Sequence, residues 1–167
     1  MFEEAPLNTA IHQRSGFDCG VPELNQYLQR FADQQRRRGI TSVFVLTDGG
    51  QPAPILGYYT LSAAEVDASR LSETDRKHLP RYSVPCFRLG RLAISAERRG
   101  QGLGRLLLGC AVDRCLQARE QVAAYALIVD AKDAGAKAFY EHYGFTAFAS
   151  QPLTLYLPLG KALDAAH

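Results

Sequence analysis

The stretch Arg98-Arg99-Gly100-Gln101-Gly102-Leu103-Gly104-Arg105 carries the strongest signal in this chain. It lies between a strand-like segment at 87–95 and a helix-like segment that continues to Ala118. Glycine permits positive φ angles and lets a ligand approach the backbone amides closely. The free N–H groups of a first helical turn, together with the helix dipole, attract an anion. The stretch therefore predicts a phosphate site, although its spacing is neither GxxxxGK[ST] nor GxGxxG.

Length and composition indicate an ordinary globular protein. The chain has 167 residues, of which 47% are apolar and 22% charged. We therefore expect a single domain, 1–167, whose core is large enough to be stable without a metal or a disulfide. The segment Met1–Pro6 is acidic, without the apolar run of a secretory signal. No stretch approaches the roughly 18 apolar residues of a membrane span. These features favour a cytoplasmic location without membrane association.

The four cysteines do not form a metal or disulfide pattern. Cys19, Cys86, Cys110 and Cys115 include no CxxC pair and match no spacing with the four histidines. We therefore expect reduced, buried thiols, which suit the cytoplasm, and no metal site.

Hydrophobic periodicity and turn residues predict a mixed α/β domain. Its fold class is α/β, of the α+β type, with a central mixed sheet flanked by helices on both faces. The predicted elements are a helix at 22–38, strands at 41–47 and 55–63, a short helix or ordered loop at 69–79, a strand at 85–95, a helix at 102–117, a strand at 122–129, a helix at 133–143, and strands at 145–148 and 153–157.

Two motifs together identify a family resemblance. The loop at 99–104 and the later stretch 138–145, AFYEHYGF, match the GNAT N-acetyltransferase superfamily in sequence and spacing. The resemblance extends over nearly the whole chain and implies a GNAT-like fold that uses acetyl-CoA. The stretches 17–20, 57–62 and 88–94 further resemble the GNAT toxins of bacterial toxin–antitoxin modules.

The resemblance to the toxins implies a particular activity. Such enzymes acetylate the α-amino group of aminoacyl-tRNA and so block translation, and their partners are small ribbon-helix-helix antitoxins. Two alternatives remain: a GNAT enzyme acting on a small-molecule amine or a protein N-terminus, and a catalytically silent domain that binds an acidic partner. A homodimer is compatible with an exposed sheet edge and the apolar strand at 153–157.

The resemblance also assigns roles to individual residues. Tyr140 would lie near the coenzyme sulfur as the general acid; the alternative is a core aromatic, like Phe139. Asp133 stands where many family members have Asn, and we expect it to cap its helix. The residues assigned to acetyl-CoA are Leu92, Ala93 and Ile94, which would pair with the pantetheine as an extra strand does, and Arg99, Gly100, Gln101, Gly102, Leu103, Gly104 and Arg105 around the pyrophosphate.

The residues on the strand at 85–95 indicate which kind of amine the enzyme could acetylate. An α-amino group has a pKa of about 8 and is far more often neutral than a lysine amine with a pKa of about 10.4, which needs a nearby base. Where a base would project, the chain has Arg88 and Arg91 rather than a carboxylate. This favours a substrate whose amine is already largely neutral.

Clustered basic residues suit the phosphate backbone of tRNA. Each could equally be solvated surface, and the run at 36–38 also suits the C-terminus of a helix. Tyr58 or Tyr59 could stack on a terminal base, or simply pack within its strand. The basic candidates are Arg36, Arg37, Arg38, Arg76, Lys77, Arg81, Arg88 and Arg91.

Overall fold

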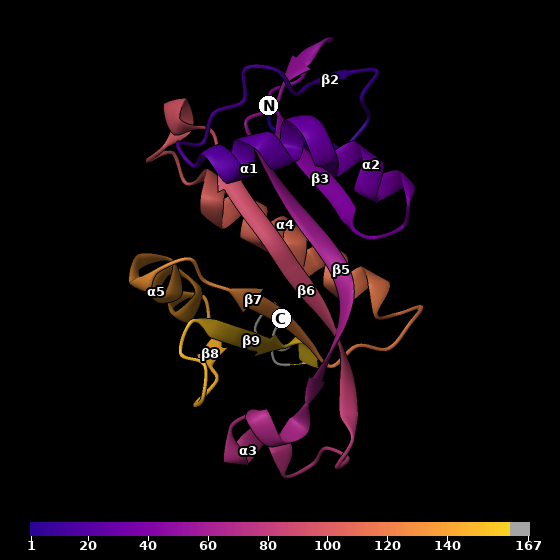
Figure 1. Ribbon diagram of the computed structural model, residues 1–167, viewed down its shortest axis with the longest axis vertical. Coiled ribbons are helices and arrows are strands. Elements are labelled where there is room, and N and C mark those ends of the chain that lie inside the picture. Colours follow the sequence, from indigo (N-terminus) through magenta and orange to yellow (C-terminus); the bar gives the residue numbers. More distant parts are fainter. Residues whose placement is uncertain (161–167) are drawn as a thin grey trace. The chain divides into compact units, whose positions relative to one another are not determined.

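The computed structural model describes residues 1–160, which form two compact units (Figure 1). One unit contains 1–62 and 90–111; the other contains 63–89 and 112–160. Strands β5 (Gly57–Asp67) and β6 (Ser83–Ile94) run through both units. Within the described residues, no helix combines the length and apolar character needed to cross a membrane.

The first unit is built on a sheet with the strand order β1-β3-β5-β6. Strand β3 (Ser42–Thr47) pairs antiparallel with both β1 (Glu3–Pro6) and β5. Two short strands, β2 (His12–Gln13) and β4 (Ala53–Pro54), pair separately and in parallel.

The helical segment over this sheet runs through α1 (Pro22–Gln26), a π-helical turn at Tyr27–Phe31 and α2 (Ala32–Arg37). Its buried residues join a core cluster that includes Leu28, Tyr58 and Val45. The Tyr58 hydroxyl donates to the Leu24 carbonyl at 2.7 Å, which ties the helix to β5.

Successive residues of a strand point to opposite faces of the sheet, so Gly57 faces away from the side of Tyr58. A Cβ on Gly57 would lie 2.8 Å from the Leu107 Cδ1 of α4 (Leu103–Ala118). Helices therefore cover both faces of this sheet, as predicted.

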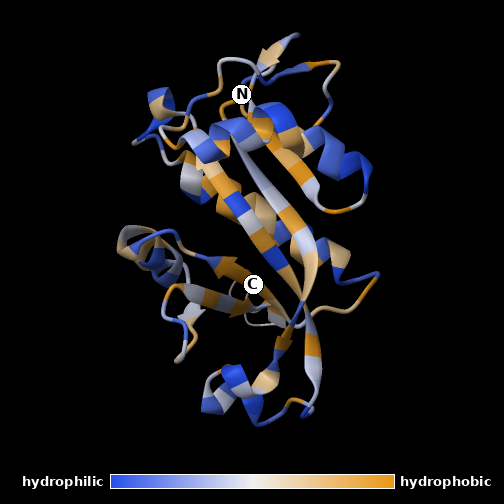
Figure 2. Cartoon of the chain, viewed as in Figure 1, coloured by the Kyte–Doolittle hydropathy of each residue, from blue (hydrophilic) through white to orange (hydrophobic). Residues whose placement is uncertain are grey.

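The second unit has the strand order β5-β6-β7-β9-β8. Strand β7 (Ala126–Asp130) is parallel to β6 and antiparallel to β9 (Thr154–Pro158), which in turn pairs with β8 (Thr146–Ala147). The sheet is therefore mixed, as predicted. Figure 2 shows β7 as largely hydrophobic, in keeping with its four buried residues.

Helical segments complete this unit. A 3-10 turn at Ala68–Arg70 and α3 (Glu73–Arg76) lie between β5 and β6, and α5 (Ala134–His142) lies between β7 and β8. Strand β9 pairs with both β7 and β8, and its residues Leu155, Tyr156 and Leu157 are buried. The homodimer stays a prediction.

The predicted element order is confirmed, with local differences. Strand β7 begins at Ala126 rather than at 122, and the predicted helix at 22–38 contains a π-helical turn. Strands β1, β2 and β4 were missed. The expectation of one domain at 1–167 stays a prediction, since 161–167 lie outside the described residues.

Candidate functional site

The glycine-rich loop presents open backbone at the start of a helix. A short 3-10 turn at Ala96–Arg98 follows β6, and α4 begins at Leu103. Gly100 has φ of 80° and Gly102 has φ of 76°, and a Cβ added to either would meet no atom within 4 Å. The Leu106 N–H donates to the Gly102 carbonyl at 3.1 Å, which starts the helical pattern. The open approach to this backbone fits a phosphate group.

Arg105 lies in the first turn of α4, with its side chain exposed. A cation there opposes the positive end of the helix dipole, an arrangement that costs about 0.3–1 kcal/mol. A bound anion would reverse that cost, so this position favours an anion site over a purely structural role. Gln101 is exposed in the same loop.

Arg99 is held by the N-terminal segment of the chain. Its Nη2 donates to the Cys19 carbonyl at 2.8 Å, and a Cβ on Gly20 would lie only 2.5 Å from that nitrogen. The Ala96 N–H also donates to the Asp18 carbonyl, at 2.8 Å. The Gly20 N–H, Asn25 and Arg99 lower the pKa of the Asp18 carboxyl, with the Gly20 hydrogen bond as the largest cause. Cys19 and Gly20 therefore shape the loop.

The end of β6 leaves one backbone edge without a strand. The register between β6 and β7 covers Cys86–Leu89, so the stretch 90–94, within the described residues, continues beyond it. On its other side the strand continues to pair with β5, and the Ser95 N–H donates to the Leu56 carbonyl at 2.8 Å. Ala93 is buried, whereas Leu92 and Ile94 are half-buried. Such an edge can hold an extended ligand as an added strand.

Tyr140 lies in the second unit, on α5. The Asp133 side chain accepts from the Ala136 N–H at 2.8 Å, which confirms Asp133 as the N-cap of this helix. Tyr140 is 8% exposed and packs edge-on against Phe139 and Phe145. Burial raises the pKa of Tyr140 to about 12. The phenol is therefore fully protonated near neutral pH.

The Tyr140 hydroxyl differs from those of other buried tyrosines. The hydroxyls of Tyr27, Tyr58, Tyr59 and Tyr156 each contact a protein partner. Within residues 1–160 no hydrogen bond involves the Tyr140 hydroxyl. A donor left without a protein partner is available to a ligand. Phe139, expected in the core, is only half-buried, and His142 is exposed beside Tyr143.

The structure sorts the basic candidates by their partners. Arg36 and Arg37 both form ion pairs with Asp33 in α2, at 2.7 and 3.0 Å. Arg38 is the C-cap of that helix. Arg88 is ion-paired with Asp130. The Arg91 guanidinium lies 3.4 Å from the centre of the Tyr27 ring. The remaining candidates, Arg76, Lys77 and Arg81, line one pocket in the second unit.

Tyr58 and Tyr59 pack within the protein rather than offering a surface for a base. Both are fully buried, and the Tyr59 hydroxyl contacts Glu4. The packing alternative is therefore confirmed for both side chains.

None of the four cysteines forms a disulfide within the described residues; Cys110 is half-buried and the other three are buried. Burial raises the pKa of Cys115 to about 12. In the described part of the chain, no cluster of three or more His, Cys, Asp or Glu side chains could hold a metal ion.

The sequence also matches a known family model. Residues 39–147 match the family described as "Acetyltransferase (GNAT) domain", a range that includes β6, the glycine-rich loop and α5. The chain belongs to the GNAT acetyltransferases. The resemblance inferred from the sequence is confirmed, and so is the predicted GNAT fold.

Relatives of this GNAT acetyltransferase include toxins. A "tRNA-acetylating toxin" of Mycobacterium tuberculosis (strain ATCC 25618 / H37Rv) is 33% identical over 148 residues, which cover 89% of this chain and 87% of that protein. A structure of AtaT complexed with acetyl-methionyl-tRNAfMet is 28% identical, covers 100% of both chains and has a TM-score of 0.93.

A third relative is a Tyr-to-Phe mutant of AtaT bound to acetyl-CoA and to the C-terminus of the antitoxin AtaR. It is 26% identical, covers 99% of this GNAT chain and 97% of that chain, and has a TM-score of 0.85.

The sequence motifs therefore identified the loop and α5, but not how the loop is held. The contacts of Arg99 with Cys19 and Gly20 join segments about 80 residues apart. The stretch 17–20 stood out only by its resemblance to the toxins, because no local pattern predicts a long-range contact.

Proposed function

We propose that this chain transfers acetyl from acetyl-CoA to the α-amino group of aminoacyl-tRNA, and that it thereby blocks translation as the toxin of a toxin–antitoxin module. The observation that carries the proposal is the 33% identity to a tRNA-acetylating toxin over 89% of the chain. The open glycine-rich loop beside the uncovered end of β6 supports the same reaction, since it suits a diphosphate-bearing thioester.

Acetyl-CoA supplies an activated acyl group with a thiolate as the leaving group. We assign the backbone of 99–104 and the charge of Arg105 to its pyrophosphate, and the edge of Leu92, Ala93 and Ile94 to its pantetheine. Arg99 would act mainly by holding the loop, since its guanidinium contacts the Cys19 carbonyl. A backbone N–H at this edge could polarise the acetyl carbonyl.

Tyr140 is the proposed general acid. The amine nitrogen attacks the carbonyl carbon, the carbon–sulfur bond breaks, and the leaving thiolate must gain a proton while the amine loses one. The support for Tyr140 is its hydroxyl, which has no hydrogen-bond partner within residues 1–160, and its pKa of about 12, which keeps the proton in place. A phenol this weakly acidic acts by donating a hydrogen bond to the sulfur as negative charge develops there. The amine nitrogen releases its proton to water and the departing thiolate takes up a proton from water, so that one proton moves from nitrogen to sulfur in the overall reaction.

The partners follow from the same proposal. An aminoacyl-tRNA substrate implies a cytoplasmic enzyme, and the AtaR-bound structure of AtaT supports an antitoxin partner here. We expect that antitoxin to be a ribbon-helix-helix protein. A homodimer remains a prediction, to be decided by light scattering. The alternative acceptor is a small-molecule amine or a protein N-terminus.

The decisive experiment incubates the protein with labelled acetyl-CoA and charged tRNA. Wild type is expected to yield acetyl-aminoacyl-tRNA, and Tyr140→Phe to lose about 10²–10⁴-fold in kcat while it retains acetyl-CoA affinity. Tyr143→Phe is the matched control, because both the Tyr140 and the Tyr143 rings contact the ring of Phe139. If the label appeared on free amines and not on tRNA, the result would instead support a small-molecule amine or a protein N-terminus as the acceptor.

A further inference from the structure

We infer that the pocket between the 3-10 turn at Ala68–Arg70 and α3 is a phosphate-binding site for the tRNA backbone. The inference rests on the proposed function, because tRNA is the polyanion that the reaction would require. Of the eight basic candidates for tRNA binding, the inference assigns this role to the three that line the pocket. The other five are assigned structural roles.

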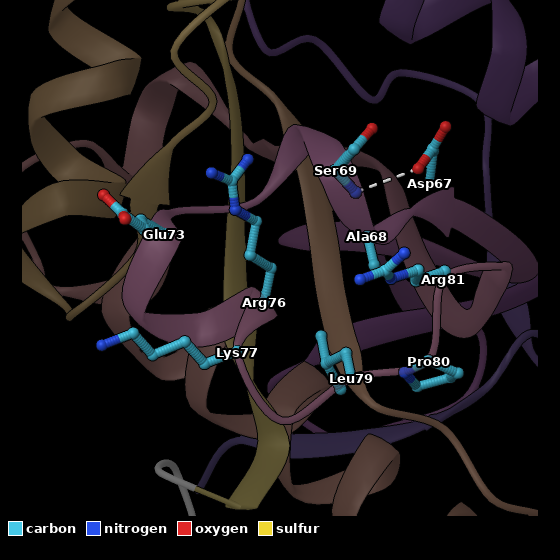
Figure 3. Close-up of a pocket in the computed structure, with 9 residues that line it drawn as sticks. All are labelled: Asp67, Ala68, Ser69, Glu73, Arg76, Lys77, Leu79, Pro80 and Arg81. Atoms are coloured by element: carbon cyan, nitrogen blue, oxygen red, sulfur yellow. Dashed lines mark hydrogen bonds between the residues drawn. The ribbon is translucent and has the colours of Figure 1, made fainter.

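The pocket has a volume of about 540 Å³ and is lined by three cations, Arg76, Lys77 and Arg81 (Figure 3). No ion pair within residues 1–160 includes any of these three side chains, and all three are exposed. By contrast, a cavity of about 310 Å³ in the first unit is lined by Asp18 and Glu97 and by no cation.

The two carboxylates of the pocket offset only part of its charge, because three cations face Asp67 and Glu73. Asp67 accepts from the Ser69 N–H at 2.9 Å, which directs one of its oxygens to the backbone as the cap of the 3-10 turn. Figure 3 shows the Glu73 carboxylate directed away from Arg81, and Arg81 extending toward Ala68. Unpaired cations around a hollow are suited to anionic groups that enter from solvent.

The surroundings favour a nucleic acid over a free anion. Tyr82 follows Arg81 directly and is 72% exposed, although a tyrosine normally buries its ring. Exposed aromatic rings beside arginines stack on unpaired bases while the cations contact phosphates. Figure 2 shows α3 and its neighbouring turns as mostly hydrophilic, in keeping with a solvated docking surface.

The pocket is held in place from the sheet. The Tyr156 hydroxyl of β9 donates to Asp75 at 2.6 Å and accepts from the Ser72 N–H at 3.1 Å. Ser72 is also the N-cap of α3. Tyr156 is fully buried, and burial raises the pKa of its hydroxyl, so this anchor stays protonated. A four-residue helix that would be marginal alone is thereby fixed, with Arg76 and Lys77 at its end.

The test measures binding of uncharged tRNA as a function of salt concentration. The variant Arg76→Gln/Lys77→Gln/Arg81→Gln is expected to bind about 10–100-fold more weakly at low salt, with the slope of log K against log salt reduced by about 2–3. Arg36→Gln/Arg37→Gln/Arg38→Gln removes the same charge and is expected to change both quantities less. Calorimetry with acetyl-CoA should give wild-type affinity for both variants, which verifies that they are folded.

A second variant separates the pocket from net charge. Tyr156→Phe removes no charge but releases α3, so we expect tRNA affinity to fall about 3–10-fold with the salt slope retained. An unchanged affinity in the pocket variant, or an equal loss in the Arg36–Arg38 variant, overturns the inference. The inference is also overturned if the pocket variant loses binding of a poly-glutamate peptide but keeps wild-type binding of tRNA. Pocket-dependent tRNA binding without acetylation would refute the proposed function alone.

Discussion

Arg99 and Cys19 are joined by a hydrogen bond of 2.8 Å from the arginine Nη2 to the cysteine carbonyl, and Gly20 lies directly beneath the guanidinium. The arginine of the phosphate loop is thus bound to the N-terminal segment of its own chain. Arg105, in the first turn of α4, has no such partner in the described residues and is exposed. The two arginines should therefore respond differently to mutation.

Arg99→Ala should lower both stability and cofactor affinity, because it removes the contact that holds the loop. We expect a loss of about 1–2 kcal/mol in the free energy of unfolding, the usual effect of deleting a charged hydrogen-bond donor. Arg105→Ala should lower acetyl-CoA affinity without a decrease in stability, since the residue opposes the helix dipole. Thermal unfolding and calorimetry distinguish these effects. Equal stability of the two variants would contradict the structural role of Arg99.

Gly57→Ala should destabilise the first unit, because α4 approaches β5 closely there. The added Cβ would lie 2.8 Å from Leu107 Cδ1 and 3.0 Å from the Ala93 carbonyl oxygen, and the backbone oxygen cannot rotate away. Overpacking of this kind costs about 1–3 kcal/mol, which lowers Tm by roughly 3–10 °C in a chain of this size.

Gly109→Ala is the matched control within α4. A Cβ there meets no atom within 4 Å, and the residue is exposed in the helix interior. Replacing glycine with alanine should therefore stabilise the helix by about 0.5–1 kcal/mol. A decrease in Tm for both variants would show that the close approach at Gly57 is not the cause.

Local patterns were sufficient to predict most of the fold. The arginines and glycines at 98–105 predicted the junction between β6 and α4, and Asp133 was identified as a cap from its position before a helical pattern. Strands β2 and β4 have two residues each, which is too short for an alternating pattern to be recognised in the sequence. The early start assigned to β7 arose because the apolar residues from Val122 onward resemble a strand, although pairing begins only at Ala126.

The site was predicted less completely, because partners are set by long-range contacts. The sequence offered eight basic candidates, and the contacts of Arg36 and Arg37 with Asp33, of Arg88 with Asp130 and of Arg91 with Tyr27 separated these residues from those of the pocket. Tyr156 gave no sequence signal as the anchor of Ser72, since 84 positions separate them. Charge pattern identifies candidates, but packing decides which of them remain available.

Arg91 and Tyr27 should show a measurable energetic coupling. The guanidinium lies 3.4 Å from the ring centre, and the Tyr27 hydroxyl is fixed by a 2.7 Å hydrogen bond to Gln35. A double-mutant cycle with Arg91→Met and Tyr27→Leu should give a coupling of about 0.5–2 kcal/mol in chemical denaturation. Arg91→Met should leave the salt dependence of tRNA binding close to that of wild type. If the effects of the two single mutations on the free energy of unfolding were additive, Arg91 would not be coupled to Tyr27. Arg91 would then again be a candidate for tRNA binding.

The pH dependence of acetylation should reveal the burial of Tyr140. Its hydroxyl must be protonated to donate to the leaving thiolate, and its pKa is raised to about 12 by burial. Activity should therefore rise as the substrate amine loses its proton near pH 8 and then remain level through pH 10. A tRNA that carries its amino acid through an amide rather than an ester allows kcat to be measured across this range without deacylation.

The same burial makes a prediction for folding. A tyrosine whose pKa is higher in the folded state binds its proton more tightly there, so the stabilisation is complete below about pH 10 and is lost as pH rises toward 12. Tyr140→Phe cannot ionise, so its stability should fall less than that of wild type between pH 10 and 11.5. A descending limb of kcat near pH 10 that disappears in Tyr140→Phe would instead mean that the phenol titrates as in water. In that case Tyr140 would lie in a solvated site and could transfer its proton fully to the thiolate.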